Sequence, residues 1–494
     1  MKREYLPLGS LPAWLRLNGI DTNGVAFQRL GSSESGADKG NALVATENKS
    51  SSDSDASPEV LLRVPADLVL SLETVHDYSK SDQDLREVLE AVGDFGRTAR
   101  GAIMIFLLVQ LTHSSPEMPK SIGVSNPWTE YIKFFPPSFP LPTFYSAEEQ
   151  ELLRGTSLGE AVAAKESSLE REFEHLRHST EHIAWCQLCW WDENNGKLTF
   201  DDLTYVDAAY RSRMVDLPGS GHAMVPGIDM ANHVSGNGVK ALYDADSDGN
   251  AILQLRWGKS LQSGEEVTIS YGDEKPASEM IFSYGFLESD RTQAKQVFLD
   301  MTMPDDDPLA IAKNMICRET PGIRVSMVQD TSQKSQQTTW DSPLVWWACV
   351  NEEDGLQIGV TQTTEGTREL ETFWKGEHIQ SPTQLRDLLA ADQAWEIFQL
   401  RAVILVSKRL ETQLSLLQET HEVLNNLREN ETLFNKLFRP EIFALVSRLR
   451  KLEAELLDRA VNDLMKQRNE LIASETVTAY LAQQSQSEEV EDFS

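Results

Sequence analysis

The chain has 494 residues, of which 40% are hydrophobic and 25% are charged. This composition is ordinary for a globular protein and excludes a collagen-like, mucin-like or wholly disordered chain. At roughly 100–200 residues per domain, the length corresponds to about three domains. The 45 lysines and arginines stand against 77 acidic residues, which gives a net charge of −32. That average field would repel nucleic acid and anionic membranes, so it argues against both as partners, and it permits a basic protein partner. The same charge also keeps a protein soluble, and this second interpretation stays open.

The chain has four cysteines, which are too few for a disulfide framework in a sequence of this length: Cys186, Cys189, Cys317 and Cys349. The first two form a C-x-x-C pair, but no second close pair completes a zinc site, so we expect buried thiols on a helix and no metal. The N-terminus lacks the apolar run of a signal peptide, and the longest apolar stretch, residues 101–109, is half as long as a membrane span. We therefore expect a soluble monomer in the cytoplasm, the nucleus or both.

The first part of the chain predicts a small β-unit. A helix is expected directly after an N-cap at Ser10. Short strands are expected at residues 25–30 and 60–65, with Asn-Gly turn signals before the first of them. Two polar, serine-rich stretches, residues 32–37 and 48–57, are expected to be loops, the second of them disordered.

The following part of the chain has a helical pattern. Residues 98–111 predict a buried helix with Thr98 as its N-cap. A proline-rich break occupies residues 136–142, and Ser146 stands three residues before Glu149, which is the spacing of a capping box. Helical periodicity continues over residues 159–191.

The last parts of the chain return first to β-like runs and then to helices. We expect strands at residues 251–256 and 266–271, a mixed region that is hard to assign, and helices at 385–417 and 431–472. The predicted organisation is the N-terminal part of a β-unit (1–79), a helical insert (80–205), the C-terminal part of the β-unit (206–290), a mixed and then helical domain (291–480) and a frayed acidic tail (481–494).

Two motif segments carry polar or glycine positions that suit a ligand. Residues 39–45 place a glycine turn before a strand, where a ligand can approach the backbone, although a simple hairpin turn has the same pattern. Residues 225–233 place Asp229, Asn232 and His233 among apolar side chains. An asparagine amide both donates and accepts, which suits the edge of an adenine, whereas a satisfied turn is the plainer interpretation.

Two further segments carry tyrosines. In residues 263–273, a glycine-led turn feeds a predicted strand that ends at Tyr271, and a strand end is a rigid place to hold a phenol. Tyr284 follows thirteen residues later, and Phe286 two residues after that. Such dense aromatic side chains line an apolar channel or belong to the core.

Taken together and in this order, the segments resemble the SET-domain protein methyltransferases. The branch they resemble includes the plant Rubisco large-subunit lysine methyltransferase and related fungal and animal enzymes. The resemblance covers residues 1–290, and the helical region 381–475 is similar to the substrate-binding domain of that branch. The segments that carry it are 18–19, 24–25, 39–45, 62–68, 128–132, 136–142, 211–213, 229–233, 264–272 and 284–286.

The resemblance implies an α+β fold: small β-sheets with a pseudoknot, interrupted by a helical insert and followed by an α-helical C-terminal substrate-binding domain. It implies a protein-lysine N-methyltransferase that uses S-adenosyl-L-methionine and requires no metal. The partner would be a histone or non-histone protein that presents a lysine in a basic segment. Two alternatives stay open: a catalytically weak SET-like binding module, and a protein-histidine methyltransferase.

The resemblance also implies roles for single residues. Tyr271 would be the catalytic residue, with its hydroxyl beside the transferring methyl group. Tyr284 and Tyr243 would border the channel of the substrate lysine, and Phe286 would pack against the cofactor. The remaining cofactor-binding residues would be Gly40, Asn41, Ala42, Ser212, Arg213, Asp229, Asn232 and His233.

The implied cofactor contacts differ in kind. Asn232 and His233 would contact the adenine end, and Arg213 would lie near the carboxylate, where a fixed guanidinium fits. Two positions depart from the family pattern. Ala42 replaces the second glycine of the first motif, and Val234 replaces a small polar residue after the Asn-His pair.

Overall fold

The structure is a computed structural model, and it describes residues 1–32, 38–52, 58–119, 121–194, 196–319, 321–329, 336–362, 368–428 and 431–491. Its contacts divide the chain into two compact units. Unit 1 comprises Met1–Tyr145, Val162–Glu274 and Glu279–Asp290, and unit 2 comprises Ser146–Ala161, Lys275–Ser278 and Arg291–Ser494. Residues 33–37, which are most of the first serine-rich stretch, residues 53–57, which are half of the second, and the last three residues of the acidic tail lie outside the described residues. In the described half of the second stretch, Lys49–Ser50 form a short strand where a loop was expected.

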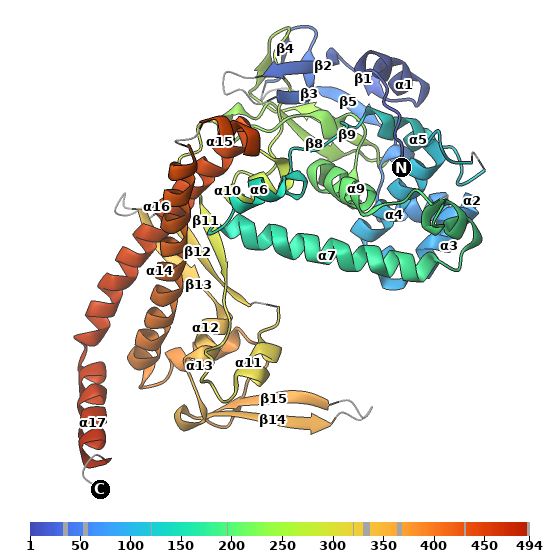
Figure 1. Ribbon diagram of the computed structural model, residues 1–494. Helices are drawn as coiled ribbons and strands as arrows, with labels where there is room; N and C mark the ends of the chain where they lie inside the picture. The colour runs from blue at the N-terminus through green and yellow to red at the C-terminus, as the bar shows by residue number, and fades with distance from the viewer. Residues whose placement is uncertain are drawn as a thin grey trace. The chain divides into compact units, whose positions relative to one another are not determined.

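Short strands in unit 1 form small antiparallel sheets, drawn in blue and green in Figure 1. Their bounds are β1 Asp21–Thr22, β2 Val25–Ser32, β3 Asp38–Ala45, β4 Lys49–Ser50, β5 Val60–Val64, β6 Met214–Leu217, β7 Gly221–Met224, β8 Ala241–Ala245, β9 Ala251–Leu255 and β10 Ser260–Leu261. The sheets are β1-β5-β9-β8, β2-β3, β4-β10 and β6-β7. The predicted strands at 25–30, 60–65 and 251–256 are confirmed as β2, β5 and β9. β2 pairs with β3, and β5 pairs with β9 from a distant part of the chain. β5 and β9 also bury most of their apolar side chains.

The predicted strand at residues 266–271 is wrong. The segment makes single bridges only, from Glu266 to Val44 and from Ile269 to His233, the latter parallel. A ladder does not build because the segment changes neighbours along its length: residues 264–267 bond to Leu43 and Ala45, and Ile269 bonds to Asn232 and Val234. The segment passes between two parts of the chain, as the expected pseudoknot requires.

The helices of unit 1 lie mainly between the two groups of strands in the sequence. They are α1 Leu11–Leu17, α2 Leu72–Ser81, α3 Gln83–Ala91, α4 Ala99–Ser114, α5 Pro127–Tyr131, α7 Ser157–Thr180, α8 Ala184–Cys186, α9 Phe200–Arg213 and α10 Ala277–Tyr284. α7 and α10 take their first residues from unit 2. Thr98 caps α4 as predicted, since its hydroxyl oxygen accepts from the N–H of Gly101 at 3.0 Å. Ser10 takes the N-cap position of α1 as predicted, but its side chain does not cap the helix, because the hydroxyl donates to the carbonyl of Pro7 at 2.7 Å.

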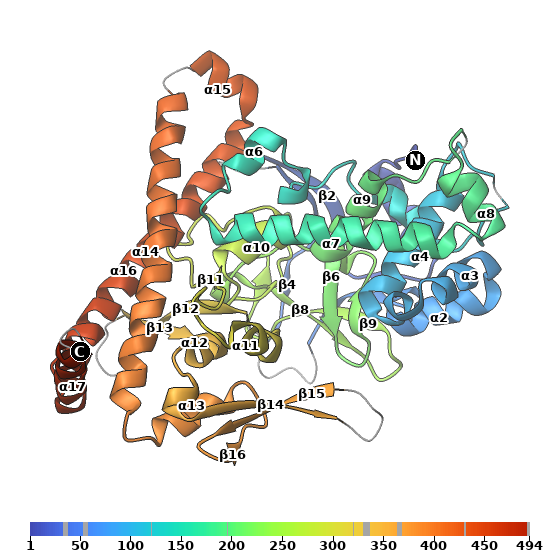
Figure 2. The ribbon, with the colours of Figure 1, turned by 60° about the horizontal axis from the view of Figure 1, so that its bottom comes forward.

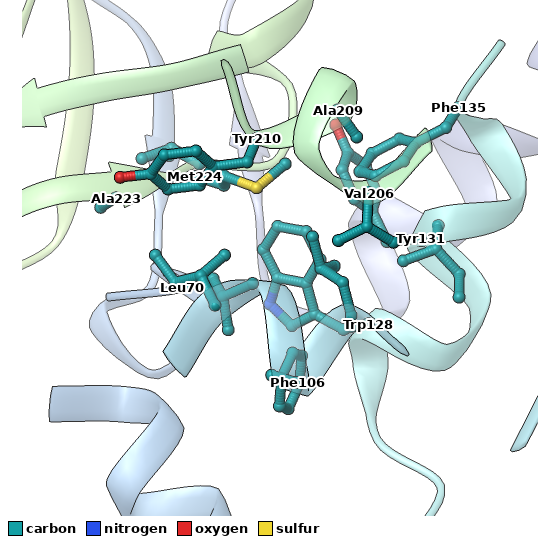
Figure 3. Close-up of a cluster of buried hydrophobic side chains, with 14 of the residues drawn as sticks. Leu70, Phe106, Trp128, Tyr131, Phe135, Val206, Ala209, Tyr210, Ala223 and Met224 are labelled. Atoms are coloured by element: carbon teal, nitrogen blue, oxygen red, sulfur yellow. The ribbon is translucent and has the colours of Figure 1, made fainter. Parts of the chain in front are cut away.

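The core of unit 1 forms around α4, which packs against α9. Nearly every residue of α4 is buried, so its apolar sequence has no polar face to turn to water. Figure 3 shows the centre of this cluster, where Leu70, Phe106 of α4, and Trp128 and Tyr131 of α5 come from three separate segments. The indole N–H of Trp128 donates to the carbonyl of Leu68 at 3.2 Å, so its one polar atom is satisfied.

Unit 2 combines two small sheets with long helices. Its strands are β11 Gln296–Asp300, β12 Gly322–Gln329, β13 Gln336–Asp341, β14 Leu356–Gln362, β15 Arg368–Trp374 and β16 Glu377–His378. Its helices are α6 Ala147–Glu151, α11 Ala310–Ile316, α12 Pro343–Ala348, α13 Gln384–Ala390, α14 Trp395–Arg428, α15 Glu431–Leu437, α16 Pro440–Ile472 and α17 Glu475–Glu491. The sheets are β11-β12-β13 and β14-β15-β16, and the predicted C-terminal helices are confirmed as α13 to α16. α14 and α16 lie side by side in Figures 1 and 2. Among the described residues, no helix is long and apolar enough to cross a membrane.

Buried charged side chains of α16 hold the segment Ser146–Ala161 within unit 2. The carboxylate of Glu453 accepts from the N–H of Ser157 at 2.9 Å and from its hydroxyl at 2.5 Å, and so caps the N-terminus of α7. Arg450 donates to the carbonyls of Leu152 and Arg154, at 3.2 and 2.6 Å. Burial raises the pKa of Glu453 from 4.5 to about 7, although the hydrogen bonds from Ser157 act in the opposite direction.

The raised pKa of Glu453 predicts a defined pH dependence of stability. Between about pH 4.5 and 7 the folded chain holds a proton that the unfolded chain has released, so the free energy of unfolding falls as the pH rises through this window and then levels off. Glu453→Gln removes the titration. We subtract the urea midpoint of E453Q from that of the wild type at each pH. We expect this difference to decrease as the pH rises from about 5 to 7. Glu455→Gln, an exposed glutamate on the same helix, is the control. Parallel midpoints for wild type and E453Q across this range would contradict the prediction.

Candidate functional site

Three of the four motif segments meet at one backbone crossing in unit 1. The N–H of Val267 donates to the carbonyl of Leu43 in the first segment, at 2.8 Å. Two residues further on, the N–H of Ile269 donates to the carbonyl of Asn232 in the second segment, at 2.9 Å. The third segment therefore lies between the first and the second, with a hydrogen bond to each.

The carboxylate of Glu266 joins the side chains of the same three segments. It accepts from the amide Nδ2 of Asn232 at 2.7 Å and forms an ion pair with Lys39 at 3.0 Å. The side chain of Glu266 is mostly buried, at 17% exposed. The donor end of the Asn232 amide is therefore engaged by the protein, as the interpretation of the motif as a satisfied turn predicts.

Tyr271 emerges at the end of the crossing segment with its hydroxyl held. The hydroxyl donates to the carbonyl of Ala231 at 2.9 Å, and the ring stacks on His233, with centroids 5.1 Å apart and planes 24° apart. On the other side lies Tyr284, with centroids 4.5 Å apart. Burial raises the pKa of Tyr271 far above its usual value, with a further contribution from Tyr284. The side chain is therefore a neutral phenol whose single proton is committed.

The imidazole of His233 is a fixed support for this tyrosine. Its Nδ1 accepts from the N–H of Tyr271 at 2.9 Å, so the ring proton belongs on Nε2. That nitrogen lies 3.2 Å from the carboxylate of Glu288 and 3.2 Å from the hydroxyl of Ser235. The side chain of His233 is fully buried. Both ring nitrogens are thus engaged by protein atoms, and any ligand contact of this residue falls to its backbone or ring face.

Further aromatic rings extend the site from Tyr271. Tyr284 ends α10, and burial raises its pKa to about 12, with the charge of Glu279 and the neighbouring Tyr243 adding to the effect. Tyr243 lies on β8, and burial, followed by the charge of Asp216, raises its pKa as well. The ring of Phe286 lies 6.2 Å from that of His233. The structure therefore brings all four predicted aromatic residues together, each of them half-buried.

Arg213 and Asp229 form a buried ion pair beside this cluster. Nη1 of Arg213 lies 2.9 Å from Oδ2 of Asp229, whose side chain is 1% exposed. Nε of Arg213 is buried and has no hydrogen-bond partner in the described part of the chain. The predicted Ser212 lies next to Arg213 on α9, but its hydroxyl donates to the carbonyl of Ala208 at 2.7 Å within the helix. The pair approaches the tyrosine, since the charges of both side chains act on the pKa of Tyr271.

The first motif segment contributes backbone to the site. Gly40, Asn41 and Ala42 lie on β3, opposite Leu30, Arg29 and Gln28 of β2. Gly40 has a φ of +70°, and a Cβ built there would meet no atom of the described residues within 4 Å. The strand therefore has open space at this glycine. Ala42 is fully buried, so the methyl group that departs from the family pattern fills a core position.

Three residues at the site have roles that the sequence did not reveal. Glu266 and Glu288 bind the side chains of Asn232 and His233, and the hydroxyl of Tyr131 donates to Asp229. Each of them lies inside or within two residues of a motif segment, but nothing in the local pattern indicates its partner. Their positions along the chain were the only available signal.

The C-x-x-C cysteines lie apart from these contacts. Cys186 and Cys189 are buried free thiols on a helical segment, as predicted. Burial raises the pKa of both, which makes them poor nucleophiles and poor metal ligands. Within the described residues, no group of three or more His, Cys, Asp or Glu side chains is placed to hold a metal ion.

The curated proteins that are similar to this chain are a SET domain-containing protein and several N-methyltransferases. No protein-family model matches the chain. SET domain-containing protein 8 of Schizosaccharomyces pombe is 27% identical over 299 residues, which are 60% of this chain and 63% of that protein. The chloroplastic fructose-bisphosphate aldolase-lysine N-methyltransferase of Arabidopsis thaliana is 26% identical over 189 residues, 37% of either chain. The actin-histidine N-methyltransferase of Xenopus tropicalis is 22% identical over 321 residues, 62% of this chain and 47% of that protein. The chain thus spans less than two thirds of the length of these curated relatives.

Solved structures extend the likeness to nearly the whole chain. The crystal structure of the SET domain of LSMT bound to MeLysine and AdoHcy has a TM-score of 0.60 at 17% identity, and it covers 95% of this chain and 94% of that one. The predicted fold is therefore confirmed: small SET-domain sheets, a helical insert and a helical C-terminal region. The resemblance to SET-domain methyltransferases of the Rubisco large-subunit branch is confirmed as well.

The backbone after Tyr284 predicts a sensitive position. Gly285 has a φ of +79°, and a Cβ built there would lie 2.4 Å from the carbonyl oxygen of Pro140. Gly264 has a similar φ of +85° with no atom within 4 Å of its Cβ position, so Gly264→Ala is a matched control. The shared conformational cost is about 1–2 kcal/mol. We expect Gly285→Ala to lower the free energy of unfolding by clearly more than Gly264→Ala in urea titrations. Equal losses would show that the Pro140 contact costs nothing.

Proposed function

We propose that the chain is a protein methyltransferase that uses S-adenosylmethionine and transfers a methyl group to a lysine of a protein substrate. The observation that carries the proposal is the fixed hydroxyl of Tyr271 among half-buried aromatic rings at the backbone crossing. The lysine methyltransferases among the relatives and the SET-domain fold support it. The structures of Rubisco LSMT bound to AdoMet support the choice of cofactor.

The residues present fit such a cofactor. S-adenosylmethionine has a carboxylate, and the unpartnered Nε–H of Arg213 is a donor that an anion can satisfy. It also has an adenosine moiety, for which the open space at Gly40 and the ring of Phe286 offer backbone and apolar contacts. When bound, it would supply a sulfonium methyl group, whose bond to sulfur breaks as a bond to the acceptor nitrogen forms. No metal is needed for this displacement.

The hydroxyl of Tyr271 has a defined direction in this chemistry. Since its proton goes to the carbonyl of Ala231, its remaining lone pairs can only accept. An acceptor of this kind suits the N–H groups of an amine and the polarised C–H groups of a sulfonium methyl. Because its pKa is raised, the phenol stays neutral and does not act as a base at neutral pH. Its contribution is therefore to orient the amine and stabilise charge in the transition state.

The aromatic rings around Tyr271 determine the protonation state of a lysine. The acceptor amine must be neutral to attack, so the substrate lysine has to lose its proton to solvent. The rings of Tyr284 and Tyr243 present little polarity, and a lysine placed between such rings has a lowered pKa. This arrangement favours the free amine without a dedicated base.

Histidine is a second candidate for the target residue. It is favoured by the relatives named actin-histidine N-methyltransferase. A neutral imidazole needs no lowering of its pKa to attack a methyl group at neutral pH. The two candidates differ in the atom that carries the methyl group in the product.

Tyr271→Phe tests the role of the tyrosine hydroxyl. We expect the rate of methyl transfer to fall by about a hundredfold or more, since an oriented acceptor in the transition state is lost. The dissociation constant of S-adenosylmethionine, measured by calorimetry, should change by less than about threefold. Tyr78→Phe, which removes a hydroxyl that donates to the carbonyl of Asp67, is the control. Unchanged turnover in Y271F would remove Tyr271 from the catalytic role.

A labelling experiment tests which residue of the substrate receives the methyl group. The full chain, incubated with labelled S-adenosylmethionine and cell extract, should place label on a lysine in a basic protein segment, located by mass spectrometry. Turnover should weaken at high salt, because the chain has a net charge of −32. Label on histidine would favour the second candidate. Tight cofactor binding with no labelled protein from any extract would contradict the proposed activity.

A further inference from the structure

The carboxylate of Asp229 is held by donors from three parts of unit 1. Arg213 at the end of α9 approaches Oδ2 at 2.9 Å. The hydroxyl of Tyr131, at the end of α5, donates to Oδ1, and so does the N–H of Gly227 at 3.0 Å. The N–H of Gly227 also donates to the hydroxyl oxygen of Tyr131, at 2.8 Å. The tyrosine hydroxyl therefore binds both the start of the Asp229 turn and its carboxylate.

The ring of Tyr131 is closely packed on all sides that the aromatic neighbours cover. It is fully buried in the core of unit 1, where Figure 3 shows it with Trp128 and Phe135. Its ring centroid lies 4.8 to 6.1 Å from those of four aromatic neighbours: Trp14, Trp128, Phe134 and Phe135. Burial, with the nearby charge of Asp229, raises the pKa of the Tyr131 phenol, so its proton remains available for donation. The hydroxyl is thus a rigid point of attachment.

A single helical turn joins this attachment to the candidate catalytic tyrosine. Asp229 lies in a 3₁₀ turn, Ile228–Met230, which ends when the N–H of Ala231 donates to the carbonyl of Ile228 at 3.0 Å. The carbonyl of Ala231 then accepts the hydroxyl of Tyr271, at 2.9 Å. A shift of the turn moves this carbonyl, and with it the direction in which the Tyr271 hydroxyl points.

We propose that Tyr131 is a positioning residue for methyl transfer: its hydroxyl fixes the Gly227–Asp229 turn, and the turn sets the carbonyl of Ala231 that orients Tyr271. This inference rests on the proposed function. Tyr131 does not itself touch the tyrosine that it positions. Its effect falls on the transfer step, because the contact between Ala231 and Tyr271 determines how the lone pairs of the phenol meet the amine.

The test compares Tyr131→Phe with a matched variant. Tyr131→Phe keeps the packed ring and removes both hydrogen bonds of the hydroxyl. Tyr205→Phe removes a hydroxyl that donates to the carbonyl of Pro136 at 2.9 Å, from a ring that is 2% exposed in the same core, but outside the Asp229 turn. Single-turnover rates are measured on the full chain at saturating S-adenosylmethionine, with the unmethylated form of the protein segment in which mass spectrometry locates the label. Rates are divided by the concentration of cofactor-binding sites, so that a loss of folded protein does not count as a loss of rate.

We expect the single-turnover rate of Y131F to fall by about tenfold, which corresponds to the loss of one well-oriented interaction in the transition state. The dissociation constant of S-adenosylmethionine should stay within about twofold, and Y205F should keep the wild-type rate. A purely structural role predicts lower melting temperatures for both variants and equal rates per site. Wild-type rates in Y131F would therefore overturn the proposal.

A second substitution covers the case in which Y131F does not fold. Incorporation of 3-fluorotyrosine at position 131 keeps the ring and the hydroxyl but changes the donor strength of the hydroxyl. The proposal predicts an altered single-turnover rate for this protein and an unaltered rate with 3-fluorotyrosine at position 205. Equal rates for the two proteins would contradict it. Absence of turnover in wild type and Y205F alike would instead count against the proposed function.

Discussion

The site depends on one constraint, the passage of an extended segment between two others. Residues 264–271 bond to β3 on one side, through Leu43 and Ala45, and to the Asn232 segment on the other. Neither side makes a ladder, so a few hydrogen bonds hold the crossing, and the apolar side chains of Val267 and Ile269 are buried within it. Because the crossing is threaded, the tyrosine at its end cannot move without breaking contacts in two directions. This explains how a side chain on irregular backbone is held as firmly as one on a strand.

Three carboxylates pair the polar side chains around the crossing. Glu266 takes the Asn232 amide, Glu288 faces the imidazole of His233, and Asp229 takes a guanidinium. Buried carboxylates are costly unless they are paired and hydrogen-bonded, and here each of the three has at least one donor. The acidic residues, which outnumber the basic ones in this chain, therefore also build the frame of the site. The surfaces left to a ligand are aromatic rings, backbone and the Nε–H of Arg213, which suits a reaction that depends on orientation.

Local signals in the sequence predicted local structure well. Thr98 and Ser146 cap their helices as expected, because a cap depends on residues within one turn. Ser10 directly precedes its helix as expected, but its hydroxyl does not cap it, because the hydroxyl donates to the carbonyl of Pro7. The motif segments could be recognised from their order along the chain. The pairing of His233 with Glu288 could not be predicted, because the two residues lie 55 positions apart and no spacing rule joins them. Pairings of this kind are set by the threaded topology, which no local pattern encodes.

The cap that Glu453 provides for α7 also bears on the order in which the chain can assemble. The two residues of this contact lie 296 positions apart. At about 5–20 residues per second, a ribosome needs roughly 15–60 s to travel from the first residue to the second. Until then, the N–H of Ser157, in the opening turn of a 24-residue helix, lacks the carboxylate that accepts it in the folded chain. During that interval the N-terminus of α7 has no cap from Glu453. A residue synthesised late therefore completes a helix whose sequence was synthesised much earlier.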